Sequence, residues 1–112
     1  MPNESTGPTS ATHVDAVART AIGPGVEVRE LPGVPGIRPW VIDLAPGAEW
    51  PGVDEHTTFG EAYFVVAGTV IDGDIAYGPG SYLFFEPGTS HRPRTETGAR
   101  AFGFNYDLPK DP

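Results

Sequence analysis

The sequence predicts a single all-β domain, built as a small sandwich or barrel. Short apolar segments, several with apolar and polar residues alternating, recur at a spacing of roughly ten residues. The 15 glycines and 13 prolines are spread along the chain without a repeat, as expected for turns between strands. No segment shows a convincing helical periodicity. With 112 residues, the chain is long enough for one domain with one hydrophobic core.

The N-terminal segment differs in composition from the rest of the chain. Residues 1–20 are rich in Ser, Thr, Pro and Ala, and we expect them to form a flexible or loosely draped arm that includes His13. Residues 21–112 then form the domain. The first residues lack the basic and apolar regions of a secretion signal, and no apolar run reaches the roughly 20 residues that cross a bilayer. We therefore expect a cytoplasmic protein with no membrane association.

The first half of the domain predicts two strands. Val26–Leu31 alternates apolar and polar residues, as a half-buried strand does. Pro32–Gly36 has the composition of a turn, and Ile37–Leu44 follows as a second strand. Residues 48–60 show no regular pattern, and they contain His56.

The second half predicts a series of hairpins. Glu61–Ala67 has the clearest strand pattern, and a tight turn at Asp72-Gly73-Asp74 joins two shorter strands. Asp72 and Asp74 are expected to serve the turn and are given no chemistry. The remaining predicted strands are Thr69–Ile71, Ile75–Tyr77, Ser81–Glu86 and Ala99–Tyr106. The aromatic residues expected to fill the core are Trp40, Tyr63, Phe64, Phe85, Phe102 and Phe104.

Composition excludes several classes of function. The formal net charge is −8, from 7 Lys and Arg against 15 Asp and Glu, and an acidic surface repels a phosphate backbone. We therefore expect no nucleic-acid partner. The absence of cysteine excludes disulfides, thiolate zinc sites and a cysteine nucleophile. The sequence also contains no phosphate-binding loop, dinucleotide fingerprint or serine-nucleophile motif.

Three residues carry the strongest chemical signal: His56, Glu61 and His91. Two imidazoles and one carboxylate can hold a divalent first-row metal and leave coordination positions open for a substrate or oxygen. His91 follows a predicted turn that contains Pro87 and Gly88, and Glu61 begins the best-defined strand. We predict a metal site formed by these three residues, which requires that their side chains converge. Iron, zinc, manganese or nickel would suit this donor set.

The stretch from Gly47 to His91 resembles the two-motif signature of the cupins. Glu61, six intervening residues and Gly68 match the end of the first motif, and Gly80 to His91 matches the second with its proline one place late. The flanking segments are similar to the anti-sigma-factor-like branch, which also contains small diketone dioxygenases. The resemblance covers about residues 25–106. It implies a double-stranded β-helix, the cupin or jelly-roll barrel.

The chain departs from the cupin pattern at its first motif. Where the family has His-x-His, the sequence reads Glu55-His56-Thr57. Aligned on Glu61 without a gap, the two family histidines fall on Glu55 and Thr57, and strand alternation places His56 on the opposite face from Glu61. Either an extra residue bulges near Gly60 and restores His56 to the site, or Glu55 takes the place of a histidine.

The resemblance implies a mononuclear-metal enzyme that acts on a small oxygenated molecule, as a dioxygenase, lyase or isomerase. Two alternatives remain open. The chain could be a non-catalytic small-molecule sensor or binding module, or a metal-free isomerase or cyclase in which Glu61 or His91 acts as general acid or base.

Strand alternation also predicts the lining of the pocket. Tyr63 and Val65 share the face of Glu61, so both should line the pocket, with Tyr63 near the substrate. Val26–Leu31 is expected to be an exposed edge strand. Cupins cover such an edge with a second subunit, so a homodimer is expected.

Overall fold

A computed structural model describes residues 6–108 of the chain. One 3-10 turn, η1 (Val14–Ala16), precedes the strands. The strands are β1 (Thr20–Gly23), β2 (Val26–Glu30), β3 (Ile37–Leu44), β4 (Asp54–His56), β5 (Phe59–Gly68), β6 (Val70–Asp72), β7 (Ile75–Tyr77), β8 (Tyr82–Phe85), β9 (Thr89–His91) and β10 (Ala99–Asp107). The predicted all-β fold class is confirmed.

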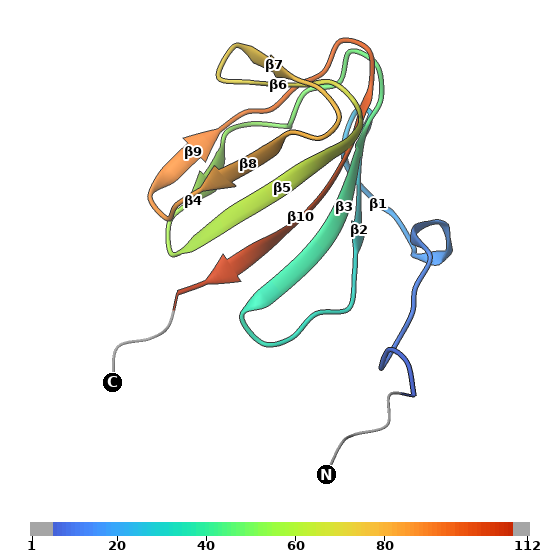
Figure 1. The fold of residues 1–112 in the computed structure, drawn as a ribbon. Helices are drawn as coiled ribbons and strands as arrows, with labels where there is room; N and C mark the ends of the chain where they lie inside the picture. The colour runs from blue at the N-terminus through green and yellow to red at the C-terminus, as the bar shows by residue number, and fades with distance from the viewer. Residues whose placement is uncertain (1–5, 109–112) are drawn as a thin grey trace.

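The strands form one large antiparallel sheet and two small ladders. The large sheet has the order β1-β2-β3-β10-β5-β8, and the small ladders pair β4 with β9 and β6 with β7. Figure 1 shows the β6–β7 hairpin at one end of the molecule and the β2–β3 connection at the other.

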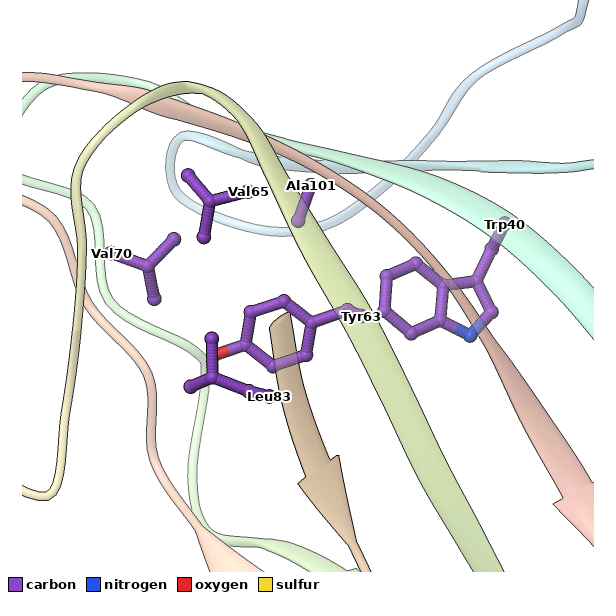
Figure 2. Close-up of a cluster of buried hydrophobic side chains, with 6 residues drawn as sticks. All are labelled: Trp40, Tyr63, Val65, Val70, Leu83 and Ala101. Atoms are coloured by element: carbon purple, nitrogen blue, oxygen red, sulfur yellow. The ribbon is translucent and has the colours of Figure 1, made fainter. Parts of the chain in front are cut away.

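The hydrophobic core lies on the inner face of the large sheet. β5 points Glu61, Tyr63 and Val65 inward, and each is less than a tenth exposed. The core residues drawn in Figure 2 are Trp40, Tyr63, Val65, Val70, Leu83 and Ala101. A second cluster joins Val26, Leu44 and Ala48. Glu61 is therefore the polar end of an otherwise apolar inner row.

The N-terminal part contains a strand that the sequence analysis missed. Thr20–Gly23 pairs antiparallel with β2, so β1 rather than Val26–Leu31 forms this edge of the sheet. The prediction that Val26–Leu31 is an edge strand is wrong. The division into an arm over residues 1–20 and a domain over 21–112 stays a prediction, and residues 1–5 lie outside the described part. No helix in the described part has the length and hydrophobicity that crossing a bilayer would require.

The outer face of the large sheet carries exposed aromatic residues. Phe64, Tyr82, Phe84 and Phe102 are 45%, 59%, 55% and 46% exposed. Register places Phe102 opposite Phe64, and Phe64 opposite Tyr82, in one row across three strands. Phe64 and Phe102 were expected in the core, and that expectation is wrong. Alternation along β5 and β10 explains the error, because each strand presents bulky apolar side chains on both faces. We call these four residues the outer aromatic face.

Candidate metal centre

Four side chains converge inside the fold: Asp54, His56, Glu61 and His91. Each offers one ligand atom, and these atoms all lie within 4.8 Å of one another. Asp54 and His56 are two residues apart on β4, so they share one face of that strand. Asp54 lies directly opposite His91 on β9, and Glu61 comes from the start of β5. Three separate strands therefore supply one cluster.

Hydrogen bonding fixes the orientation of His56. Its Nδ1 lies 2.9 Å from Oγ1 of Thr89, the residue opposite it on β9. The Thr89 hydroxyl donates its own hydrogen to the carbonyl oxygen of Glu86 at 2.7 Å. Thr89 must then accept a hydrogen from Nδ1 of His56. This arrangement leaves Nε2 of His56 facing the carboxylates of Asp54 and Glu61.

A buried carboxylate orients His91 in the same way. Nδ1 of His91 lies 2.8 Å from Oδ2 of Asp72, and the Tyr63 hydroxyl donates to the same oxygen at 2.8 Å. Asp72 accepts both bonds, so Nδ1 of His91 carries a hydrogen and Nε2 faces the cluster. A histidine that binds a metal commonly has its second nitrogen bonded to a carboxylate in this manner. Tyr63 and Asp72 thus support the cluster from behind.

The carboxylates bracket the two imidazole nitrogens. Nε2 of His91 lies 3.1 Å from Glu61 Oε2 and 3.1 Å from Asp54 Oδ2. Nε2 of His56 lies 3.1 Å from Asp54 Oδ2 and 3.6 Å from Glu61 Oε1. The side chain of Glu61 is 7% exposed and that of Asp54 is 25% exposed. Asp54 is therefore the ligand candidate with the most access to solvent.

The cluster is rich in buried negative charge. Among residues 6–108, the ion-pair partners of Asp54, Glu61 and Asp72 are the two histidines, with no lysine or arginine. A single protonated histidine would balance only one of the three carboxylates, and a buried carboxylate left without a cation costs several kcal/mol. A divalent cation would compensate the carboxylates, and carboxylate and imidazole donors suit a first-row metal. The residues present therefore fit a metal ion.

The charges shift the ionisation of the cluster. Burial lowers the pKa of His91, but its hydrogen bonds to Asp54, Asp72 and Glu61 outweigh that effect and raise the pKa to about 11. Burial raises the pKa of Asp54, and its hydrogen bonds with His91 and His56 bring it below the ordinary value of 3.8. Burial and the neighbouring charge of Asp72 raise the pKa of Tyr63 well above its ordinary value. The metal-free cluster therefore holds a proton on His91.

A cavity of about 430 Å³ leads to the cluster. It extends from the β2–β3 connection to Asp54 and Glu61, and Trp40 and Trp50 contribute to its wall. Its volume falls within the range of small-molecule sites. A smaller apolar cavity adjoins it and touches Tyr63 and His91. A small molecule could therefore reach the cluster from one side.

The structure brings the predicted ligands His56, Glu61 and His91 together. Glu55 is exposed on the other face of β4, so the alternative in which Glu55 replaces a histidine is wrong. The extra residue between His56 and Glu61 is not held in a bulge. β4 ends at His56, Thr57 and Thr58 form a bend, and β5 begins at Phe59. Side chains alternate between faces only within a continuous strand, and the bend interrupts it. Counting residues from Glu61 therefore assigned His56 to the wrong face.

Two residues of the site were missed, and one was misplaced. Asp54 precedes His56 by two residues. If the two histidines of the cupin motif are aligned one residue earlier, they fall on Asp54 and His56, and this alignment would have identified Asp54 as a ligand candidate. Asp72 was assigned to a turn alone, yet it is 8% exposed and bonds His91. Val65 was expected to line the pocket. It is fully buried in the core and is absent from the walls of both cavities, so that expectation is wrong.

Comparison with known proteins gives fold neighbours. No family model matches the chain, and no curated protein matches its sequence. An RmlC-like cupin from Shewanella frigidimarina aligns with a TM-score of 0.77 and 19% identity, over 89% of this chain and 92% of that one. A predicted oxalate decarboxylase from Thermotoga maritima aligns with a TM-score of 0.73 and 19% identity, over 88% of this chain and 100% of that one.

A third neighbour comes from a complex of two proteins. A chain of the Rhodobacter sphaeroides complex between SigE and the anti-sigma ChrR aligns with a TM-score of 0.73 and 20% identity. The alignment covers 85% of this chain and 52% of that one. These neighbours confirm the cupin fold that the sequence motifs implied. The chain therefore has the fold of a small cupin.

Proposed function

We propose that the chain binds one divalent transition metal through Asp54, His56, Glu61 and His91, and acts on a small oxygenated molecule. The observation that carries the proposal is the convergence of two imidazoles and two carboxylates, whose ligand atoms all lie within 4.8 Å of one another, with no lysine or arginine among the described ion-pair partners of those carboxylates. The predicted ligand set of His56, Glu61 and His91 is thereby extended by Asp54.

A metal held there would act as a Lewis acid on an oxygen atom of the substrate. The protein's own contribution is positional. Thr89 and Asp72 hold the two imidazole rings with their Nε2 atoms inward. Trp40 and Trp50 form a wall against which the rest of the substrate would pack. A reaction at a carbonyl group suits this arrangement, and dioxygenase, lyase and isomerase chemistry all stay predictions.

The geometry favours a metal over the metal-free alternative. In a metal-free acid–base site, Glu61 or His91 would have to exchange a proton with the substrate. Here both side chains are less than a tenth exposed and are bonded to each other. A non-catalytic sensor would bind its ligand in the same cavity without needing a metal, so thermal shifts with candidate ligands but none with metals would select that alternative.

Metal titration tests the proposal. We expect the full chain to bind one equivalent of Zn²⁺ or Mn²⁺, and Glu61→Gln, which keeps the size of the side chain, to lose most of that affinity. His13→Ala is the matched control, because His13 lies outside the cluster with its ring bonded to the backbone of Asp15. Absence of metal binding by the folded wild-type chain, measured by calorimetry and elemental analysis, would overturn the proposal.

We also propose a homodimer, in which the outer aromatic face is covered by the same face of a second copy. Its four members are roughly half exposed and would together offer about 400 Å² of apolar surface. That area is about half of what each partner buries in a standard interface, and a polar rim would add the rest. A cytoplasmic location and the absence of a nucleic-acid partner stay predictions from the sequence.

A further inference from the structure

We infer that this site selects uncharged ligands with an apolar body and discriminates against anions of the same shape. The inference rests on the proposed metal centre and names its substrate class. Three features carry it: the charge of the cluster, the lining of the cavity and the pairing of the cation at the cavity wall.

The charges of the ligand side chains already neutralise a divalent ion. Asp54 and Glu61 together carry two negative charges, which match a divalent cation, and both imidazoles are neutral when their Nε2 atoms bind it. Asp72 adds a third carboxylate in direct contact with His91. The loaded site would therefore carry a net charge of about −1, counted over these groups, and an anionic ligand would meet repulsion in a partly buried environment.

Most of the residues that line the cavity leading to the cluster are apolar. Its apolar lining residues include Val28, Leu31, Ile37, Trp40, Ile42 and Trp50. Such a surface favours an aromatic or aliphatic group, and each apolar contact excludes water from the bound ligand. The polar part of a ligand would then face the cluster.

The cavity offers no free cation to an anionic ligand. Arg38 is its single lysine or arginine among the described lining residues. The Arg38 guanidinium donates to Asp107 at 2.9 Å and lies over the ring of Phe59. The Trp40 indole N–H donates to the side-chain oxygen of Asn105 and is occupied as well. Glu30, also in the lining, adds to the negative potential.

A pair of probes of closely similar shape, one neutral and one anionic, tests the inference. 1-Phenylpropane-1,2-dione and benzoylformate share a benzoyl group, and the methyl group of the dione is replaced by a carboxylate oxygen in benzoylformate. We would load the full chain with Co²⁺ and follow its visible spectrum as each probe is added. We expect the dione to bind at least about tenfold more tightly than benzoylformate.

Three variants assign the preference to the cluster. Asp54→Asn removes one negative charge beside the cavity and should reduce the dione preference by about tenfold. Asp72→Asn removes a charge while keeping all four ligands, so it tests the same point if Asp54→Asn loses the metal. Asp74→Asn, an exposed residue in the same hairpin as Asp72, changes the net charge equally and should leave the preference unchanged.

The outcomes separate the two proposals. Failure of the folded chain to bind Co²⁺ would overturn the metal centre and, with it, this inference. Normal Co²⁺ binding with equal or tighter binding of benzoylformate would overturn the inference alone. Co²⁺ binding with no response to either probe would also contradict it.

Discussion

Each histidine of the cluster is defined by what its Nδ1 atom bonds. His56 bonds a threonine hydroxyl that is itself committed to a carbonyl, and His91 bonds a carboxylate. The carboxylate is the stronger partner, because a charged acceptor increases the basicity of the ring. We therefore expect His91 to be the better metal donor, with Asp72 as the residue that makes it so.

Asp72→Asn tests this role of the buried carboxylate. The amide keeps the size of the side chain but removes its charge, so metal affinity should fall by about 10–100-fold. Competition with a coloured chelator would measure the affinity. Asp74→Asn is the control, since Asp74 is exposed and has a left-handed backbone that asparagine tolerates. Equal affinities in the two variants would show that Asp72 does not support the metal.

Metal binding should depend on pH through His91. In the metal-free cluster the pKa of His91 is raised to about 11, so the ring is protonated at neutral pH and the metal must displace that proton. Affinity should therefore rise by about tenfold per pH unit through the neutral range, for one proton released. Calorimetry in buffers of different ionisation enthalpy would count the proton. An affinity that levels off just above 6.5, the ordinary pKa of histidine, would contradict this.

At the scale of elements, the short bend between β4 and β5 decides the site. The sequence identified β5 and its inward face, because Tyr63 and Val65 lie in a clear apolar pattern. It could not locate the bend at Thr57 and Thr58, since no glycine or proline marks it. Counting alternate residues across the bend then assigned His56 and Glu61 to opposite faces. The β4–β9 pairing, which brings Asp54 opposite His91, is a contact between distant segments that local pattern does not encode.

The hairpin β6–β7 shows the same limit. The Asp-Gly pair at Asp72 and Gly73 correctly predicted a turn. It did not reveal that the Asp72 side chain points into the core, where it meets Tyr63 and His91. A turn residue with a second role cannot be distinguished by composition from one without it.

Gly103 keeps β10 close to its neighbours on the inner face. It lies opposite Trp40 on β3 and Tyr63 on β5. A Cβ there would lie 2.6 Å from Cβ of Tyr63 and 2.8 Å from the ring of Trp40, and it would also meet the carbonyl oxygen of Ala62. Gly103→Ala should therefore destabilise the fold by about 1–3 kcal/mol, the usual cost of overpacking.

Urea denaturation would measure that change in the free energy of unfolding. Gly78→Ala is the matched control, because a Cβ at Gly78 meets no atom within 4 Å and its backbone is not left-handed. We expect Gly78→Ala to leave the unfolding midpoint near that of the wild type. A Gly103→Ala chain as stable as this control would show that β10 can shift to make room.

At the scale of the whole molecule, the sequence predicted the barrel better than its surfaces. The recurring short strands, the turn positions and the cupin motifs all pointed to one fold, which the structure and its neighbours share. The aromatic residues were less informative. Tyr63 and Phe85 pack inside, whereas Phe64 and Phe102 lie outside, although all four occur in apolar strands. Periodicity shows which residues share a face of such a strand, but it does not show which of the two faces is exposed to solvent.

The outer aromatic face predicts the oligomeric state. Phe102, Phe64 and Tyr82 form one cross-strand row, and Phe104, Ala62 and Phe84 form the next. Neither row contains a charged side chain, although the chain carries a net charge of −8. An acidic protein that keeps this face free of charge avoids repulsion where two copies would meet, and two sheet faces can pack against each other directly.

Phe64→Glu should therefore convert a dimer into a monomer, because two added carboxylates would face each other near the symmetry axis. Sedimentation equilibrium would give the mass of each variant. Ile75→Glu is the control, since Ile75 is 57% exposed on the β6–β7 hairpin, away from that face. We expect it to remain dimeric with the same added charge. A monomeric wild type at sub-millimolar concentration, or dissociation of both variants alike, would rule out this interface, since in the second case charge alone would account for the loss.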